Sequence, residues 1–213
     1  MTAEDDLYQI ADELRAVASA GLRFADHGYD KERYEKILRA SARLVALVAH
    51  QSFEDIYSQY TDNLAHLSPL LCVESVVFRD GKILLIRRHD DGLWAVPGGL
   101  AEVGETLAQA AERELWEEAG VRGKASRLLA LLDSRLWNSR SRMHLCIAQF
   151  LMESDDEPVL HANENAHSSF SEALDVGFFA EQALPELSKG HDLRVPALFK
   201  MIRGEIDTPY FDH

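Results

Sequence analysis

The sequence predicts an α/β (α+β) protein in two parts: a small all-helical N-terminal domain, residues 1–65, and a mixed α/β domain, residues 66–213. Three observations predict this division. Apolar residues recur at helical spacing through the first 65 residues. From Leu70 onward, short Val- and Leu-rich runs alternate with turn residues on both sides of one central helix. The length of 213 residues allows a small domain beside a medium one, or one large domain.

The first domain is expected to hold three helices. One stripe of the first helix is formed by Leu7, Ile10, Leu14 and Val17, which lie three and four residues apart. Gly28 ends that segment, Asp30 is expected to cap a second helix, and a third begins after Ser52. The buried side of the third helix is predicted to consist of Phe53, Ile56, Tyr57 and Tyr60. Helices this short bury little surface alone, so we expect the domain to pack against something, in a packing or dimer-forming role.

The second domain is expected to alternate strands with two helices. Strands are predicted at 71–78, 83–86, 128–132, 144–151 and 176–179, and helices at 105–119 and 195–202. Asp80-Gly81 predicts a hairpin turn, and Gly120 is a suitable residue to end the central helix. At Pro97-Gly98-Gly99 we expect a sharp turn, because glycine adopts backbone conformations closed to other residues.

Composition narrows the class of protein. Lys and Arg number 22 against 36 for Asp and Glu, a formal charge of −14, which argues against a nucleic-acid partner because phosphate binding needs a positive excess. Such a balance suits an enzyme in which a cluster of carboxylates holds divalent cations. The two cysteines, Cys72 and Cys146, lie in apolar runs and are expected to be buried free thiols. The acidic N-terminus and the absence of a 20-residue apolar run predict a cytoplasmic chain with no membrane partner.

One segment, Gly99 to Val121, carries the chemistry. On a helix, Glu114, Glu117 and Glu118 share one face, where like charges repel unless a divalent cation that prefers oxygen ligands lies among them. Arg113 can bridge back to Glu105 and fix the preceding loop, in which a free carbonyl would supply a further oxygen. A solvated acidic face beside a plain glycine turn would explain a lone Glu triplet. It does not explain the whole segment, whose seven Gly, Glu and Arg positions coincide by chance on the order of once in 10⁸ windows.

The arrangement Gly-x5-Glu-x7-Arg-Glu-U-x-Glu-Glu-x-Gly-U, with U apolar, resembles the signature of the Nudix hydrolases without a departure. The box covers 23 residues, and the strand pattern extends the resemblance over about residues 70–212. The resemblance implies an α/β/α sandwich with a mixed sheet. It also implies an enzyme that uses Mg²⁺ or Mn²⁺ to hydrolyse the pyrophosphate bond of a nucleoside diphosphate linked to another moiety, X. It assigns metal binding to Glu114, Glu117, Glu118 and the Gly99 carbonyl, and structural roles to Glu105 and Arg113.

Features outside the box resemble one subgroup. The run Tyr29-Asp-Lys-Glu-Arg-Tyr-Glu35 and the stretch Asp175-Val-Gly-Phe-Phe-Ala-Glu181 are similar to Nudix enzymes that act on ADP-ribose or CDP-choline. Those enzymes carry a helical N-terminal domain and tend to be homodimers, and their pattern places a Glu where this chain has Glu172. The loop at 133–142 departs from the His-rich pattern of that subgroup, which leaves the choice between ribose and choline substrates open.

The resemblance and the residues together give the candidate roles. Catalytic candidates are Glu114, Glu117, Glu118 and Glu172, and the general base is left open among Glu117, Glu114 and Glu172. Substrate-binding candidates are Arg87, Arg88, Arg135 and Arg142, with Arg140 beside them, because guanidinium groups bind phosphate through paired donors. An ordinary solvated surface is the alternative for each arginine. Trp94 and Trp137 are able to stack on a base or to pack in the core.

The leading functional hypothesis is Mg²⁺-dependent hydrolysis of ADP-ribose to AMP and ribose 5-phosphate. CDP-choline is the alternative substrate. A non-catalytic nucleotide-sugar sensor and a hydrolase of damaged nucleoside triphosphates are rivals, and the intact set of glutamates favours an enzyme over the sensor. Binding of DNA through a helix-turn-helix in the N-terminal region is disfavoured by the acidic charge.

Overall fold

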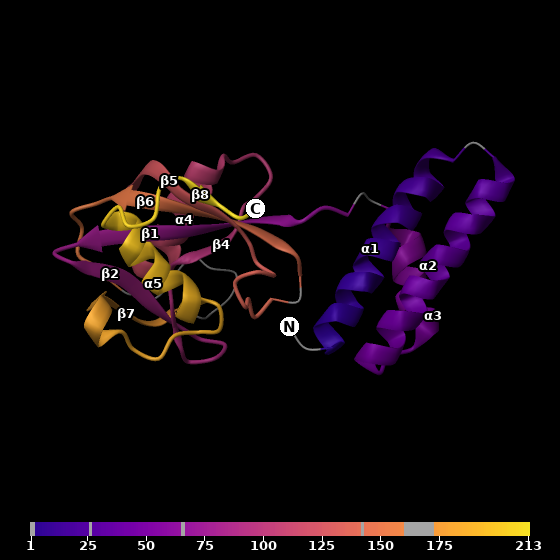
Figure 1. Ribbon diagram of the computed structural model, residues 1–213, viewed down its shortest axis with the longest axis horizontal. Helices are drawn as coiled ribbons and strands as arrows, with labels where there is room; N and C mark the ends of the chain where they lie inside the picture. The colour runs from indigo at the N-terminus through magenta and orange to yellow at the C-terminus, as the bar shows by residue number, and fades with distance from the viewer. Residues whose placement is uncertain (1–2, 26, 65–66, 142, 160–172) are drawn as a thin grey trace. The chain divides into compact units, whose positions relative to one another are not determined.

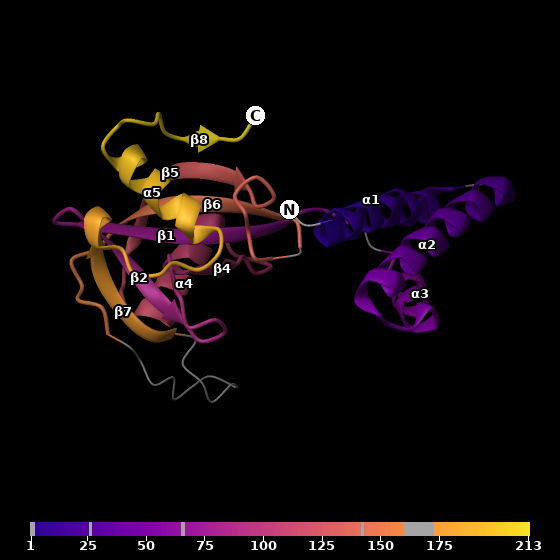
Figure 2. The same cartoon turned by 60° about the horizontal axis from the view of Figure 1, so that its bottom comes forward.

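The computed structural model describes residues 3–25, 27–64, 67–141, 143–159 and 173–213. The chain divides into two compact units, Met1–Pro69 and Leu70–His213. The first unit is helical and the second combines strands and helices, as Figure 1 and Figure 2 show. No helix of the described residues is long and apolar enough to cross a membrane.

The N-terminal unit consists of α1 (Ala3–Phe24), α2 (Gly28–Ala49) and α3 (Phe53–Asp62). Helices α1 and α2 lie side by side, and α3 packs on α2 (Figure 1). Its core consists of Ala18, Leu38, Ala42, Ile56 and Tyr60. The predicted inner side of the third helix is confirmed, because Ile56 and Tyr60 are buried and the other two members, Phe53 and Tyr57, are partly buried against that core.

The sequence predicts a capping residue for α2 and one for α3, and the structure confirms only the second. Ser52 caps α3 as predicted, and its side-chain oxygen accepts a hydrogen bond from the backbone N–H of Asp55 at 3.4 Å. Asp30 does not cap α2, which begins two residues earlier at Gly28, with His27 in the capping position. Asp30 lies in the first turn instead and pairs with Arg33 at 3.3 Å. An aspartate is favoured in a first turn by the positive end of the helix, so the same residue type is compatible with either position.

The second unit is built on one mixed sheet. Its strands are β1 (Leu70–Arg79), β2 (Lys82–Arg88), β3 (Trp94–Ala95), β4 (Gly98–Leu100), β5 (Lys124–Asp133), β6 (Leu145–Glu153), β7 (Ala173–Ala180) and β8 (Tyr210–Phe211). Their order is β3-β2-β1-β6-β5-β8, while β4 also pairs with β1 and β7 with β2. Strands β1 and β6 are parallel, and the β1–β2 hairpin turns at Asp80-Gly81 as predicted, with a positive φ at both residues.

Helices cover both faces of this sheet, with α4 (Leu107–Ala119) on one and α5 (His191–Ile202) on the other (Figures 1 and 2). A short 3-10 helix, Glu181–Ala183, follows β7. Side chains of β1 alternate between the two layers: Val73 and Val77 pack with α4, while Cys72 and Val76 pack in the core that includes α5. The predicted α/β/α sandwich with a mixed sheet, preceded by a helical region, is therefore confirmed.

Three local predictions in this unit differ from the structure. Gly98 and Gly99 lie in strand β4, paired antiparallel with β1, and not in a sharp turn. The strand β8 was not predicted, because two residues carry no periodic signal. Helix α5 begins at His191 and not at Val195, because its first turn contains polar residues that are nonetheless buried.

A buried ion pair joins α5 to the sheet. Arg194 donates to Glu74 of β1 from Nη2 at 2.7 Å and from Nε at 3.0 Å, and both side chains are almost fully buried. Gln149 of β6 donates to the second oxygen of Glu74 at 2.6 Å, and His191 lies 3.4 Å from the first. Burial alone would raise the pKa of Glu74, but Arg194 and His191 hold it below its usual value. Glu74 therefore stays ionised, and the pair anchors α5 across the sheet.

We predict that His191 makes the stability of this unit depend on pH between about 6.5 and 4. Burial lowers the pKa of His191 to about 4, from 6.5 in the unfolded chain. In that window the unfolded chain binds a proton that the folded chain does not, so stability falls as the pH is lowered from 6.5 towards 4. His191→Asn is expected to flatten this dependence by roughly 3 kcal/mol at most, measured by urea denaturation at several pH values. The exposed His89→Asn is the control, and an unchanged slope in His191→Asn would show that another group titrates.

Candidate active site

Helix α4 is fixed at both ends by its sequence. At its start, Thr106 and Gln109 form a capping box: Thr106 Oγ1 accepts from the Gln109 N–H at 3.2 Å, and Gln109 Oε1 accepts from the Thr106 N–H at 2.8 Å. At its end, Gly120 adopts φ 65°, a left-handed conformation that glycine adopts without strain. Glu117 and Glu118 fall in the last turn, which holds no basic residue. Carboxylates are unfavourable there, because the helix C-terminus carries partial negative charge.

Arg113 is the main positive group among these carboxylates. It binds Glu105 through two contacts, Nη2 to Oε1 at 2.8 Å and Nε to Oε2 at 3.1 Å, which confirms the predicted bridge to the preceding loop. Its Nη1 donates to Glu114 at 2.8 Å and to Glu117 at 3.0 Å, so one oxygen of each glutamate lies beside the same nitrogen. The hydrogen bonds to Glu105 first, and then those to Glu114, raise the pKa of Arg113. A positive charge therefore already lies between two of the candidate metal ligands.

The glycines of β4 let α4 approach the sheet edge. Gly98 is opposite Glu74 of β1, and its N–H donates to Glu118 Oε2 at 2.7 Å. A Cβ on Gly98 would overlap the carbonyl oxygen of Val73, and a Cβ on Gly99 would lie 2.5 Å from Glu114 Oε1. Glycine is needed here for close approach and not for a turn. The two glycines thus hold two of the three glutamates directly against β4.

The Gly99 carbonyl is not free in the way the sequence suggested. The hydrogen bonds from Ala101 N to Leu71 O, 3.0 Å, and from Ser75 N to Pro97 O, 2.8 Å, flank the pair of Val73 and Gly99. Antiparallel ladders alternate hydrogen-bonded and non-bonded pairs, so Val73 and Gly99 form a bonded pair and the Gly99 carbonyl faces β1. A carbonyl has two lone pairs, and only the second is left for a metal ion.

The glutamate side chains gathered here are of the chemical type that binds a hard divalent cation. Glu105, Glu114 and Glu117 contact a single guanidinium group, that of Arg113, and Glu118 accepts from the Gly98 N–H. Carboxylate oxygens are the ligands that Mg²⁺ prefers. Within the described residues, however, no three Asp, Glu, His or Cys side chains are already arranged to hold an ion. Arg113 and the Gly98 N–H occupy carboxylate oxygens instead. A metal ion would therefore bind by taking over contacts that Arg113 makes now.

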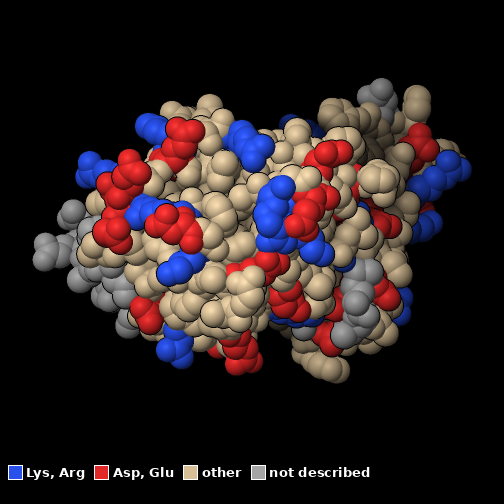
Figure 3. All heavy atoms as spheres, turned by 60° about the vertical axis from the view of Figure 1, so that its left-hand side comes forward, with Lys and Arg blue, Asp and Glu red and all other residues tan. Residues whose placement is uncertain are grey.

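The candidate phosphate-binding arginines fall into two groups. Arg88 binds Asp90 through two contacts, 3.0 and 2.9 Å, and Arg140 reaches the same carboxylate at 2.8 Å. The hydrogen bond to Asp90 is the main cause that raises the pKa of Arg88, and the negative charge of Glu118 adds a smaller effect in the same direction. Arg87, the next residue, donates to the Gly92 carbonyl at 2.8 Å. Acidic and basic side chains lie in mixed clusters over the face drawn in Figure 3.

Of the remaining charged candidates, the structure describes only Arg135. Arg135 follows β5 and pairs with Asp133 at 2.6 Å, and two strands, β1 and β6, separate β5 from β2. Arg142 and Glu172 lie outside the described residues, so their predicted roles stay predictions. Trp94 packs edge-on against Phe179, with ring centroids 4.6 Å apart, in the core.

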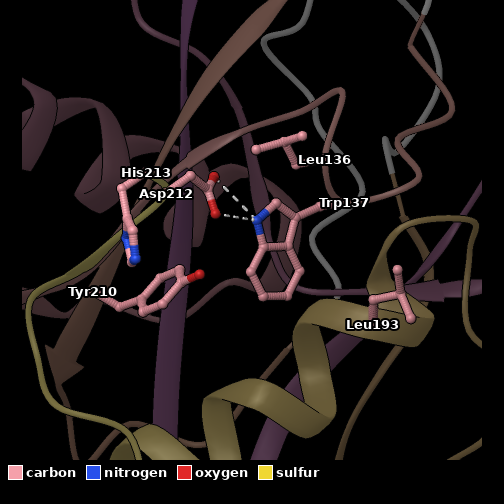
Figure 4. A pocket seen from close by; sticks show the side chains of 6 residues that line it. All are labelled: Leu136, Trp137, Leu193, Tyr210, Asp212 and His213. Carbon is pink, nitrogen blue, oxygen red and sulfur yellow. Dashed lines mark hydrogen bonds between the residues drawn. The ribbon is translucent and has the colours of Figure 1, made fainter.

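Trp137 lines a separate pocket of about 460 Å³, shown in Figure 4, with Leu136, Leu193, Tyr210, Asp212 and His213. Its indole N–H donates to both oxygens of Asp212, at 2.9 and 3.1 Å, and its ring lies edge-on to Tyr210. Burial, followed by the charge of Asp212, raises the pKa of Tyr210, so the phenol stays protonated. The pocket adjoins β8, which in this sheet is separated from β1 by β5 and β6, whereas the glutamates lie at β4 on the other side of β1. The pocket is therefore not the place where the glutamates gather.

Sequence reasoning missed two polar systems near the glutamates. One is the buried set of Glu74, Arg194 and His191, and the other is Asp91, which accepts from Ser188 at 2.7 Å and from Arg140 at 3.1 Å. A signal for the first was present: Glu74 is a lone charge inside an apolar strand, where a buried carboxylate needs a partner. Nothing in the sequence pointed to Arg194 as that partner.

Both units of the chain are similar to known protein families. The protein family described as "NUDIX domain" matches residues 71–197. The family described as "UDP-X-like, N-terminal oligomerisation domain" matches residues 5–59. "Putative ADP-ribose pyrophosphatase YjhB" from Bacillus subtilis is 32% identical over 208 residues, 95% of each chain. A crystal structure of a UDP-X diphosphatase covers 99% of this chain and 100% of its own, with a TM-score of 0.59 and 25% identity. A crystal structure of an ADP-ribose pyrophosphatase from Streptococcus suis covers 68% of this chain and 100% of its own, with a TM-score of 0.55 and 26% identity.

We predict that Gly98→Ala destabilises the second unit by about 1–3 kcal/mol, because the added methyl group overlaps the Val73 carbonyl and forces β4 away from β1. Gly177→Ala in β7 is the matched control. There a Cβ would meet only the ring of Phe179 at ordinary contact distance, so the change is expected to be neutral or slightly stabilising. Urea denaturation of both variants measures the difference. Equal effects would show that β4 does not depend on the close approach.

Proposed function

The chain belongs to the Nudix hydrolase family, and on that premise we propose that it hydrolyses the pyrophosphate bond of a nucleoside diphosphate linked to X, with ADP-ribose as the leading substrate. The products would be AMP and ribose 5-phosphate. The observation that carries the proposal is the gathering of Glu114, Glu117 and Glu118 around Arg113 and the β4 glycines. Relatives across the whole chain and across the second unit bear the name ADP-ribose pyrophosphatase, which supports this substrate over others.

The proposed site assigns different tasks to the three glutamates. Glu118 is held by the Gly98 N–H and Glu114 is packed against Gly99, so both are positioned before any ligand binds. Glu117 is more accessible to solvent, with 40% of its side chain exposed against 8% for Glu114. We assign Glu114 and Glu118, with the second lone pair of the Gly99 carbonyl, as fixed ligands of Mg²⁺ or Mn²⁺, and Glu117 as the adjustable one.

A divalent cation at this site would neutralise phosphate oxygens and lower the pKa of a bound water. The chain's own residues would orient the reaction. Arg88 and Arg87, at the end of β2, would bind the diphosphate through charge-assisted hydrogen bonds, with Arg88 exchanging its contacts to Asp90 for phosphate oxygens. A glutamate would accept the proton from the attacking water. Glu117, the most accessible of the described candidates, suits that role, with Glu114 and Glu172 as alternatives.

A second candidate substrate class has a specific basis. The N-terminal unit matches a description that begins "UDP-X-like", and a UDP-X diphosphatase resembles the chain over nearly its whole length. UDP-linked compounds therefore belong in a substrate panel, beside CDP-choline. A nucleotide-sugar sensor without turnover would retain binding but release no product.

We expect the purified protein to release AMP from ADP-ribose in the presence of Mg²⁺ and to stop when EDTA is added. Chromatography of the products over a panel of ADP-ribose, CDP-choline, UDP-glucose and nucleoside triphosphates measures the preference. Faster release from UDP-glucose would move the substrate assignment to UDP-X while leaving the site intact. Binding of ADP-ribose with no product from any compound would favour the sensor instead.

We predict that Glu118→Gln lowers kcat by roughly 10²-fold or more, because the amide keeps the shape of the side chain but loses the charge of a metal ligand. Glu112→Gln is the matched control on the same helix: its carboxylate binds Lys124 at 2.7 Å, away from Arg113. Mg²⁺ is expected to raise the Tm of the wild type and of Glu112→Gln but not that of Glu118→Gln. A near-normal rate and an undiminished Tm shift in Glu118→Gln would remove Glu118 from the metal site.

We also propose that the N-terminal unit mediates a homodimer. The matched description "N-terminal oligomerisation domain" supports this role, and so does the unit's core, which is formed by only a few large side chains. Catalysis and assembly are then separate properties of the two units.

A further inference from the structure

The pocket beside β8 takes no part in the hydrolysis proposed above. Its volume of about 460 Å³ lies in the range of binding sites for small molecules. Figure 4 shows its six lining side chains, of which three come from residues 210–213 and three from α5 and the loop between β5 and β6: Tyr210, Asp212, His213, Leu193, Leu136 and Trp137. The kinds of side chain in its wall indicate what the pocket is suited to bind.

Four of the six lining side chains are aromatic or aliphatic. The rings of Trp137 and Tyr210 stand at 87° to each other, with their centroids 6.1 Å apart, so their planes form two walls of a corner. Leu136 and Leu193 are 65% and 47% exposed, so the pocket opens to solvent between apolar side chains. Such walls favour a ligand that presents apolar groups, because contact with them removes apolar surface from water.

The carboxylate in the wall, that of Asp212, is held in place by neutral groups. The indole N–H of Trp137 donates to both of its oxygens, at 2.9 and 3.1 Å, and the backbone N–H of Asp133 donates to one of them at 2.6 Å. These donors carry no charge, so they fix the carboxylate without cancelling its negative charge. An N–H group bound to an anion is polarised, which strengthens the attraction of the indole ring for a cation.

The charges around the pocket favour a positive ligand over a negative one. The arginines that the structure describes in the β5–β6 loop face other carboxylates: Arg135 contacts Asp133 at 2.6 Å, and Arg140 contacts Asp90 at 2.8 Å. A phosphate group would meet the negative charge of Asp212, and the six lining side chains include no Lys or Arg. A bare metal ion would find one carboxylate and apolar walls that cannot replace its bound water.

We propose that this pocket binds a small organic cation, namely an ammonium group that carries methyl or other alkyl groups. The alkyl groups contact the leucines and the two rings, while the positive charge faces the ring electrons and Asp212. Aromatic rings, and tryptophan most strongly, bind quaternary ammonium groups in this way. The site takes a free cation, because β5 and β6 lie between β8 and β1, whereas the glutamates contact β4 on the other side of β1.

The test is nuclear magnetic resonance of the full chain, labelled with ¹⁵N at tryptophan, during titration with tetramethylammonium chloride. The chain has three tryptophans, and the indole signal of Trp137 is identified by its absence from Trp137→Phe. We expect that signal to shift to saturation, which NaCl at the same concentration does not reproduce. tert-Butanol has nearly the same shape without the charge, so its dissociation constant is expected to be about 10-fold higher or more.

Asp212→Asn separates the charge of the pocket from its shape, because the amide oxygen can still accept from the Trp137 indole. The variant's dissociation constant for tetramethylammonium is expected to rise about 10-fold, towards that of tert-butanol. Asp175→Asn is the matched control, since it removes an exposed carboxylate from β7, which pairs with β2 on the opposite side of β1 from β8. Its dissociation constant is expected to equal that of the wild type.

Three results would overturn the proposal: no saturating shift of the Trp137 signal, binding of tert-butanol as tight as that of tetramethylammonium, or an unchanged dissociation constant in Asp212→Asn. Circular dichroism checks that this variant is folded. If it is not, Tyr210→Leu removes one ring and keeps an apolar side chain. It is expected to raise the dissociation constant about 5-fold, and an unchanged value would count against the site.

Glu118→Gln distinguishes this site from the proposed hydrolysis. It is expected to bind tetramethylammonium as the wild type does while releasing little or no AMP from ADP-ribose. Weaker binding of tetramethylammonium by Glu118→Gln would place the cation among the glutamates and overturn the assignment to the pocket. A wild type that binds the cation but hydrolyses nothing would leave the pocket standing and remove the proposed hydrolysis.

Discussion

Repulsion among carboxylates at the end of α4 is the constraint around which the candidate active site is built. Glu114, Glu117 and Glu118 lie within two turns of a helix end that already disfavours negative charge. The guanidinium group of Arg113 and the backbone N–H of Gly98 are among the groups that offset this repulsion. Carboxylates gathered where they repel one another are suited to bind a divalent cation, because the ion's charge then adds to the stability of the folded chain.

Strand β1 connects this site to the rest of the unit. On the side of α5, Glu74 is held by Arg194 and Gln149, and β4 pairs with the same residue through Gly98. In that pair the two residues do not exchange ladder hydrogen bonds, so the Gly98 N–H points away from β1 and is available to Glu118. The register of a three-residue strand thus decides which backbone group meets a glutamate. A slip by one residue would present a bonded group and lose the contact.

The outline of this arrangement could be predicted from the sequence, and its details could not. Periodicity located the main strands and helices, and the spacing of Glu105, Arg113 and the three later glutamates predicted one acidic face and its salt bridge. Gly98 and Gly99 were identified correctly as special but given the wrong reason, since glycine serves turns and close approach alike and only the neighbouring Val73 carbonyl distinguishes them. The partner of Glu74 lies 120 positions away, and no local pattern indicates a pair so distant.

The two units solve the problem of burying apolar surface in different ways. The sheet of the second unit is covered on both faces by its own helices, so its strands bury large side chains such as Leu84 and Leu85 completely. In the N-terminal unit the contact between α1 and α2 is formed by alanine, serine and glycine, and its core contains one fully buried leucine, Leu38. Small side chains remove little apolar area from water, so the internal stabilisation of this unit is low for its length. Large apolar side chains of α1, among them Ile10, Val17 and Phe24, stay exposed in this unit.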